Sequence, residues 1–215
     1  MSFAPAETNQ RPIWHSRLAA AGRLLFGKRL FVGLAVAVAG LELLTPKPFF
    51  APGLRLSQSC ALLLVAAGLA LRAWGSGCAG KHTRSATIEA PRLVTGGPFA
   101  HVRNPIYTGT ICLGFGMAML IGDPLAFLLA ALAFAILYFS IVPAEEHFLK
   151  KQFGAEYDRY REAVPRLIPR LTPWSERAQT PFQWRAARGE CFIGLIVITI
   201  YLALHVEKYF DKVIG

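Results

Sequence analysis

The chain has 215 residues, of which 54% are apolar and only 17% are charged, and its formal net charge is +10. A soluble domain carries roughly a quarter charged residues, so this composition argues against a soluble fold. The basic residues flank apolar runs and form no DNA-reading motif or aromatic-interleaved patch. They therefore exclude nucleic acid as the expected partner and favour anionic lipid headgroups.

Long uncharged runs predict an all-α integral membrane helical bundle of about five transmembrane helices, because backbone polar groups in lipid must pair within a helix. The second expected span ends at Gly75-Ser76-Gly77, and Gly122-Asp123-Pro124 turns the third into the fourth. The first and fifth are shorter than the ~20 residues of a full crossing, so a partial hairpin or an interfacial helix is an alternative for either. In chain order, the expected spans are residues 30–44, 54–74, 105–121, 124–143 and 191–206.

Lys and Arg gather on one side of these spans, in the N-terminal arm, after the second span and after the fourth. This bias predicts a cytoplasmic N-terminus, a cytosolic cap and a multi-pass protein of a bacterial-type inner membrane. No apolar run with a small-residue cleavage site follows the basic N-terminus, so we expect no removable signal peptide. The expected divisions are an arm (1–29), a helical hairpin (30–74), a core of loop, two spans and cap helix (75–170), and a linker with the last helix (171–215).

The four cysteines, Cys60, Cys78, Cys112 and Cys191, are widely scattered. No pair has the spacing of a zinc site, and three lie in or beside apolar spans. They are interpreted as small apolar residues of packed helices, with no metal site and no disulfide framework.

The first stretch with candidate chemistry is residues 93–109, LVTGGPFAHVRNPIYTG. Its Gly-Gly-Pro sequence allows a tight turn that a ligand can approach closely. Arg103 and Asn104 precede a helix that begins at Pro105, and unpaired N–H groups at such a start suit a carboxylate or a phosphate. Tyr107, one turn further, can stack on a base or hydrogen-bond to it. The alternative is an ordinary interfacial anchor, with Arg103 at the headgroups and Tyr107 in the aromatic belt.

The second stretch is residues 143–169. It predicts an amphipathic helix that lies against the membrane or the bundle and is ended by Pro165 and Pro169. Glu145 and Glu146 follow an apolar span directly, where carboxylates are costly unless they pair. They are expected to bind a cationic cofactor, to pair with Arg103, or both. The apolar face of the helix comprises Leu149, Phe153, Tyr157, Tyr160 and Val164.

In order and spacing, the two stretches together resemble the isoprenylcysteine carboxyl methyltransferase family and the related membrane phospholipid methyltransferases. The shared pattern is Gly-Pro-aromatic, Arg-x-Pro-x-Tyr-x-Gly, a two-span hairpin, Glu-Glu, Phe-Gly, two spaced tyrosines and Val-Pro-Arg-x-Ile-Pro, over residues 81–170. The resemblance implies an S-adenosylmethionine-dependent methyltransferase that acts on a lipid-like or apolar acceptor. The methyl donor would sit at the cytosolic ends of the third and fourth spans.

Residue by residue, the resemblance implies roles for one set of positions. Arg103, or the helix N–H groups, would pair with the carboxylate of the donor, and Glu145 would bind its sulfonium cation with help from aromatic faces. Glu145 or Glu146 would serve as the base for an amine acceptor, so the expected catalytic residues are Glu145 and Arg103. The implied cofactor-binding residues are Leu93, Val94, Phe99, Asn104, Pro105, Ile106, Tyr107 and Glu145.

Three positions depart from the family pattern. Asn104 and Pro91 stand where histidines are usual, and Asn104 keeps a hydrogen-bond partner but not a titratable one. Ile141 replaces an arginine that contacts the carboxylate of the prenylcysteine substrate. A different lipid or apolar acceptor is therefore favoured, and methylation of O, N or S stays open. The rival interpretations are a nicotinamide-dependent membrane reductase, with phosphates bound by Arg84, Arg92 and Arg166, and a non-catalytic membrane protein.

Overall fold

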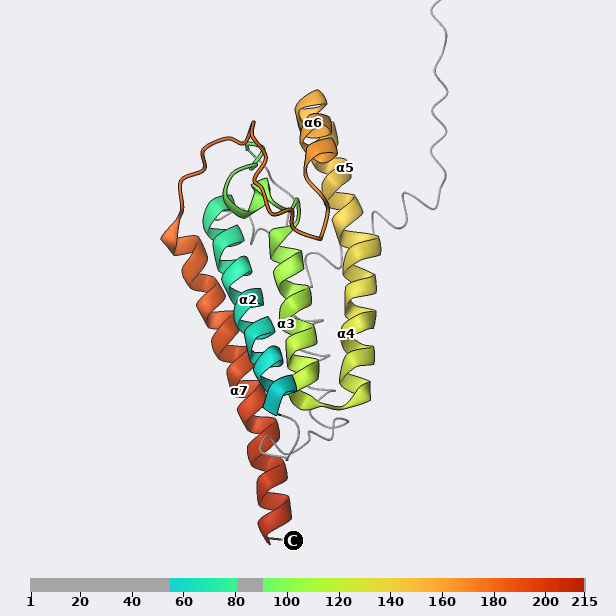
Figure 1. The fold of residues 1–215 in the computed structure, drawn as a ribbon, viewed down its shortest axis with the longest axis vertical. Coiled ribbons are helices and arrows are strands. Elements are labelled where there is room, and N and C mark those ends of the chain that lie inside the picture. Colours follow the sequence, from blue (N-terminus) through green and yellow to red (C-terminus); the bar gives the residue numbers. More distant parts are fainter. Residues whose placement is uncertain (1–54, 81–90, 215) are drawn as a thin grey trace, which may run out of the picture.

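The computed structural model describes residues 55–80 and 91–214, and the expected N-terminal arm and first span lie outside these ranges. Within them the chain forms helices and no strand, as the sequence predicts. Figure 1 shows α7, α2, α3 and α4 side by side, with α5 and α6 extending beyond the start of α3. The elements are α2 (Arg55–Ala79), the 3-10 turn η2 (Gly97–Ala100), α3 (Pro105–Ile121), α4 (Pro124–Ile136), the π-helical η3 (Leu137–Ile141), α5 (Val142–Phe153), α6 (Ala155–Ala163) and α7 (Trp184–Ile214).

Glycines bring α2 and α3 into backbone contact. A Cβ on Gly68 would lie 2.7 Å from the Gly109 carbonyl oxygen, and one on Gly116 would lie 3.0 Å from the Ala61 carbonyl oxygen. Without a hydrophobic driving force in lipid, helices associate through such close packing of small residues. The α2–α3 pair is therefore the tight centre of the bundle.

The helix α2 continues past its expected end at Gly75-Ser76-Gly77 to Ala79. Gly75 does not break the helix, because it serves as a packing position: a Cβ there would lie 2.9 Å from Ile106 Cγ1. The helix ends instead at Gly80, which has φ +81° and donates its N–H to the Ser76 carbonyl. A glycine in the left-handed region is a common helix terminator.

The fourth span also differs from expectation, since Val142-Pro143 does not end it. Residues Pro124–Phe153 form a continuous helical segment of 30 residues, with the π-helical turn η3 directly before Val142. Proline lacks an N–H, and a π turn re-accommodates the backbone around such a position. The chain therefore leaves the apolar region as a helix and carries the two glutamates at a fixed orientation.

The predicted apolar cap face is confirmed, although the helix that bears it is broken. Gly154, with φ +51°, separates α5 from α6. Tyr157, Tyr160 and Val164 are buried together with Leu93 from the first stretch. Leu149, Phe153, Ala163 and Trp174 pack against this cluster. The amphipathic face thus lies against the chain's own loops.

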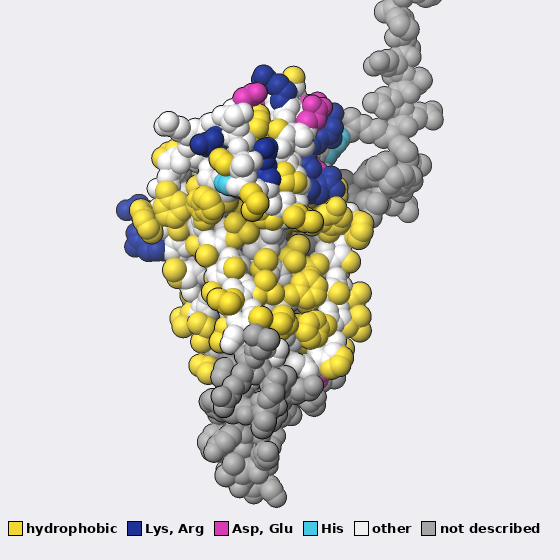
Figure 2. All heavy atoms as spheres, in the orientation of Figure 1, with side chains coloured by type: hydrophobic (Ala, Val, Ile, Leu, Met, Phe, Trp, Pro, Cys, Tyr) yellow, Lys and Arg dark blue, Asp and Glu magenta, His cyan; other side chains and the backbone are white. Residues whose placement is uncertain are grey.

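Within residues 55–80 and 91–214, two helices are long and apolar enough to cross a membrane, Ser57–Ala79 and Pro124–Phe153, and Pro105–Ile121 is apolar but shorter. The expected fifth span is part of a longer helix, α7, whose 31 residues begin at Trp184. Figure 2 shows hydrophobic side chains over the middle of the molecule, with the charged side chains gathered at the end that carries α5 and α6. This distribution is typical of a protein inserted in a bilayer.

Candidate functional site

The corner before α3 is held by backbone contacts from both sides. Pro105 opens the helix and is fully buried, a favourable position because its missing N–H would have no intrahelical partner. The Arg103 N–H donates to the Pro165 carbonyl at 2.8 Å, and the Thr108 N–H donates to the Asn104 carbonyl at 2.9 Å. The side chain of Asn104, at the N-cap position, makes no capping hydrogen bond to α3. It points across the corner, with Nδ2 3.2 Å from the Arg166 carbonyl oxygen.

One of the hydrogen bonds between the two sequence stretches that carry candidate chemistry links α3 directly to α5. The Tyr107 hydroxyl on α3 donates to Glu145 Oε1 on α5 at 3.0 Å. The two residues are 38 positions apart in the chain, so only the folding of the α3–α4 hairpin brings them together. Glu145 and the Arg103–Tyr107 corner therefore share one surface.

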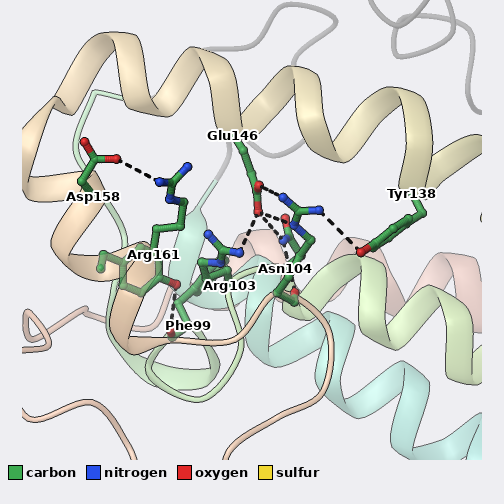
Figure 3. Close-up of polar contacts among 9 residues, drawn as sticks. Phe99, Arg103, Asn104, Tyr138, Glu146, Asp158 and Arg161 are labelled. Atoms are coloured by element: carbon green, nitrogen blue, oxygen red, sulfur yellow. Dashed lines mark hydrogen bonds and ion pairs between the residues drawn. The ribbon is translucent and has the colours of Figure 1, made fainter.

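The neighbouring carboxylate, Glu146, is the centre of a buried ion cluster. Glu146 is 8% exposed and accepts hydrogen bonds from Arg166 Nη2 at 2.6 Å and Arg166 Nε at 3.1 Å. Arg103 Nη2 lies 3.5 Å from its Oε1, and Asn104 Nδ2 donates to the same oxygen at 3.5 Å. The hydrogen bond to Glu146 raises the pKa of Arg166, which fixes its positive charge. Figure 3 shows Glu146 directed from α5 toward Arg103 and Asn104.

Arg103 has hydrogen-bonding capacity that the described residues do not use. Its side chain is 9% exposed, and one of its nitrogens pairs with Glu146. The Nε and Nη1 atoms are buried and have no hydrogen-bond partner within residues 55–80 and 91–214. Buried donors without a partner cost about 1–3 kcal/mol each. Because Nε and Nη1 lie on different edges of the guanidinium, each can donate its own hydrogen bond to an anionic group such as a carboxylate.

The remaining predicted positions support the cap. Leu93 is 8% exposed within the tyrosine cluster, and Val94 and Ile106 are half-buried. The Phe99 carbonyl accepts a hydrogen bond of 2.8 Å from the Tyr160 hydroxyl. Burial raises the pKa of Tyr160, and it raises the pKa of the neighbouring Tyr157 to about 12, so both stay neutral donors.

Comparisons with known proteins place this arrangement in a family. The phospholipid methyltransferase family model matches residues 56–156, from α2 to the start of α6. Protein-S-isoprenylcysteine O-methyltransferase B of Arabidopsis thaliana is 31% identical over 147 residues, which cover 63% of this chain and 72% of the relative. The chain belongs to the isoprenylcysteine and phospholipid methyltransferase family. The family that the motif order indicated is thereby confirmed.

Two further relatives are similar to this chain over shorter stretches. The nickel-cobalt-cadmium resistance protein NccN of Alcaligenes xylosoxydans is 32% identical over 130 residues, which cover 55% of this chain and 59% of that protein. The protein-S-isoprenylcysteine O-methyltransferase of Schizosaccharomyces pombe is 38% identical over 77 residues, or 36% of this chain and 33% of the relative. The chain thus spans about three fifths of the length of NccN. No solved structure matches.

The family match covers part of the site and stops before the rest. Arg103, Tyr107, Glu145 and Glu146 lie within it, whereas Arg166 follows its last residue. Arg166 belongs to the extended segment 164–183, here named the strap, which crosses the loops before α3. Its N–H groups at Arg170 and Trp174 donate to the His101 and Ala100 carbonyls, at 3.0 and 2.9 Å.

The strap also occupies the Gly96-Gly97 turn, where the sequence suggested close approach of a ligand. A Cβ on Gly96 would overlap the Ala178 carbonyl oxygen, and one on Gly97 would lie 2.5 Å from Cys78 Sγ. The chain's own atoms therefore use the closeness that the glycines allow. A cavity of about 270 Å³ remains between the turn and the strap, lined by Gly96, Gly97, Ser175, Arg177, Ala178, Gln179 and Thr180.

A second buried ion cluster escaped the sequence reasoning altogether. Glu190 on α7 accepts a hydrogen bond of 2.8 Å from Ser76 Oγ and pairs with Arg72 on α2, whose Nη2 lies 2.8 Å from Oε2. Arg72 also donates from Nη1 to Thr110 Oγ1 on α3. The available signal was Arg72 itself, because an arginine inside an apolar span requires a partner.

Proposed function

We propose that this chain is a membrane-embedded, S-adenosylmethionine-dependent methyltransferase with a lipid-like or apolar acceptor. The observation that carries the proposal is the corner where Arg103 offers two buried, unused N–H donors beside the Tyr107–Glu145 pair. Family membership supplies the reaction class, and this corner supplies the chemistry that the methyl donor needs. The expected catalytic pair is Glu145 and Arg103.

The residues at the corner fit the charges of the cofactor. S-Adenosylmethionine carries a carboxylate, an ammonium and a sulfonium cation. The guanidinium of Arg103 suits the carboxylate, because two of its N–H groups are already desolvated and unpaired among the described residues. Glu145, oriented by Tyr107, suits the positive charges. Glu146 is already paired with Arg166 and is better suited to hold Arg103 in place.

When bound, S-adenosylmethionine supplies an electrophilic methyl carbon for in-line displacement. The chain's residues contribute orientation and exclusion of water, which together account for much of the rate in such reactions. Glu145 would accept the proton of an amine acceptor at its carboxylate, whereas a carboxylate acceptor needs no base. The hydrogen bond from Tyr107 holds that carboxylate in one orientation.

The acceptor is proposed to be lipid-like because the corner lies at the ends of apolar helices. Ile141, at the position where the resemblance expects an arginine for a prenylcysteine carboxylate, is 3% exposed and belongs to the apolar core. Because Ile141 carries no charge, it cannot pair with the carboxylate of a prenylcysteine. We therefore favour another lipid or an apolar small molecule, reached from within the bilayer.

The topology is part of the proposal. Five transmembrane helices, with the cap and the N-terminus in the cytoplasm of a bacterial-type inner membrane, agree with the distribution of Lys and Arg along the chain. The proposed divisions are residues 1–29, 30–74, 75–170 and 171–215. The described charged residues of α5 and α6 share one end of the molecule, which is the end assigned to the cytoplasm (Figure 2).

Thermal unfolding of the detergent-purified protein tests the cofactor. A ligand that binds only the folded state raises its stability by RT ln(1 + [L]/Kd), so adenosylhomocysteine should raise the unfolding temperature in a dose-dependent way. A reduced nicotinamide dinucleotide is the matched comparison and should have no effect. Transfer of a radiolabelled methyl group into a membrane lipid extract then tests the reaction. Absence of adenosylhomocysteine binding by calorimetry would contradict the proposal.

A further inference from the structure

The start of the strap, residues 165–171, is fixed against the first turn of α3. The Pro165 carbonyl accepts the Arg103 N–H at 2.8 Å, and the Leu167 carbonyl accepts the Thr108 hydroxyl at 3.1 Å. These bonds fix the position of the loop along the axis of α3. The loop therefore lies at the same depth in the membrane as residues 105–108.

That depth is the boundary of the hydrocarbon layer. The 17 residues of α3 span only about 25 Å at 1.5 Å per residue, whereas the hydrocarbon core is ~30 Å thick. The first turn of α3 consequently lies at or below the headgroup boundary. Trp74 supports this level: it is 45% exposed and adjoins Gly75, which contacts Ile106 on α3. Tryptophan is enriched at membrane interfaces.

The loop presents apolar side chains outward and keeps its cations against the protein. Ile168 is 81% exposed and Leu171 is 98% exposed. Arg166 turns inward to Glu146, with 2.6 Å between Nη2 and Oε2, and Arg170 Nη1 donates to the Ala163 carbonyl at 2.9 Å. In water this arrangement exposes two large apolar residues with no compensating contact.

The loop also contacts the fourth span, which has exposed apolar residues of its own. The Arg166 guanidinium lies over the Tyr138 ring, 5.6 Å from its centroid. Tyr138 contacts Phe139 edge-on, with ring centroids 5.1 Å apart, and Phe139 is 74% exposed. One turn earlier, Ile136 is 51% exposed. The loop therefore contacts this helix at Arg166 and Tyr138, and both elements carry exposed apolar side chains.

We propose that residues 165–171 form a membrane-inserted lip, in which Ile168 and Leu171 enter the boundary between headgroups and acyl chains. The partner is the lipid bilayer in which the helices lie, so the inference rests on the membrane placement of the proposed function. The lip is bonded to Arg103, Asn104 and Thr108, so it borders the Tyr107–Glu145 corner on the side of the lipid. An apolar acceptor can then approach this corner without crossing water.

Site-specific fluorescence tests the lip in the full chain. An environment-sensitive fluorescent amino acid is introduced by stop-codon suppression at Ile168, so the native cysteines stay in place. The protein is reconstituted into phosphatidylcholine and phosphatidylglycerol vesicles that contain lipid spin-labelled near the carbonyl end or near the methyl end. Because Ile168 is largely exposed, the label does not disturb the packing. Two matched positions are labelled in parallel, exposed Leu132 on α4 and exposed Glu156 at the cap.

The expected pattern distinguishes the lip from the bundle. The label at Ile168 should emit at shorter wavelength than the label at Glu156 and be quenched chiefly by the shallow spin label. The label at Leu132 should be quenched by lipid spin labels and the label at Glu156 by neither. If the label at Leu132 is quenched while the label at Ile168 behaves like the label at Glu156, the proposed lip is wrong but the proposed membrane placement stands. If Leu132 is not quenched either, both are wrong.

Discussion

The described part of the molecule contains two buried arginine–carboxylate clusters, which differ in how many of their hydrogen-bonding groups have partners. In the cluster between α2 and α7, both oxygens of Glu190 are bonded, and Arg72 reaches Thr110 as well. In the cluster beneath the cap, Arg103 keeps two buried donors without a partner among the described residues. We call the first cluster closed, because its charged groups are bonded to one another, and the second open, because two of its donors have no partner among the described residues.

The difference separates a structural role from a binding role. A closed cluster gains nothing from a ligand, because its hydrogen-bonding capacity is spent within the protein. An open one holds desolvated donors at a cost, which a bound anion removes. We therefore propose that a buried arginine marks a binding site only where some of its donors lack a partner, as those of Arg103 do among the described residues. The predictions below test this distinction.

The largest expected effect is on stability, at the closed cluster. Glu190→Ala leaves Arg72 buried without its carboxylate, and we expect the free energy of unfolding to fall by about 3–5 kcal/mol. Chemical unfolding in mixed micelles measures this. The double variant R72M/E190L removes both charges and should recover most of the loss. A Glu190→Ala protein as stable as the parent would show that this cluster is not closed.

The next effect is on cofactor affinity, at the open cluster. Arg103→Met removes the donors proposed for the carboxylate, and we expect adenosylhomocysteine binding to weaken by about 1.5–3 kcal/mol, roughly 10- to 150-fold. Isothermal calorimetry measures the dissociation constant. Arg166→Met is the matched control on the same carboxylate, and it should weaken binding less because its hydrogen bonds go to Glu146 and Tyr138. Equal losses in the two variants would remove the distinction between them.

A smaller effect is expected at the hydrogen bond between Tyr107 and Glu145. Tyr107→Phe frees Glu145 from its 3.0 Å partner, and we expect kcat/KM for methyl transfer to fall by about 0.5–1.5 kcal/mol, up to roughly tenfold. Tyr138→Phe is the control, since its hydroxyl has only a 3.5 Å contact with Arg166. Should both variants lose activity equally, the orientation of Glu145 is not the cause.

The smallest effect is on the pH dependence of stability. The pKa of Tyr157 is raised from 10.0 to about 12, chiefly by burial, so between these values the unfolded chain loses a proton that the folded protein keeps. Stability contributed by neutral Tyr157 is complete below pH 10.0 and is lost as the pH rises to about 12. Tyr160 acts in the same direction. Across this pH window, the unfolding temperature of Tyr157→Phe should fall less steeply with pH than that of the parent protein. An equal slope for the two proteins would show that the cap is open to water.

Local signals were sufficient for much of the fold. Pro105, Gly122 and Pro124 bound the α3–α4 hairpin where the sequence predicted, since proline and glycine act through their own backbone. The spacing of the apolar residues likewise predicted the buried face of the cap. The end of α2 was not predicted correctly, because Gly75 marks contact with Ile106 on another helix and not a chain reversal. The continuous helix through Pro143 was not predicted either, because a proline commonly ends a helix and the π-helical turn before Val142 leaves no local sequence signal.

The sequence by itself determined that the chain is apolar, helical and basic-flanked, and the order of its motifs indicated the family. Only the tertiary structure decided which charged groups meet. The sequence predicted a bridge from Glu145 or Glu146 to Arg103, and the structure assigns it to Glu146, which also pairs with Arg166. The structure also joins Tyr107 to Glu145 and pairs Glu190 with Arg72. Backbone preferences are local and leave a trace in each segment, whereas an ion pair between distant residues depends on how helices pack, which no single segment encodes.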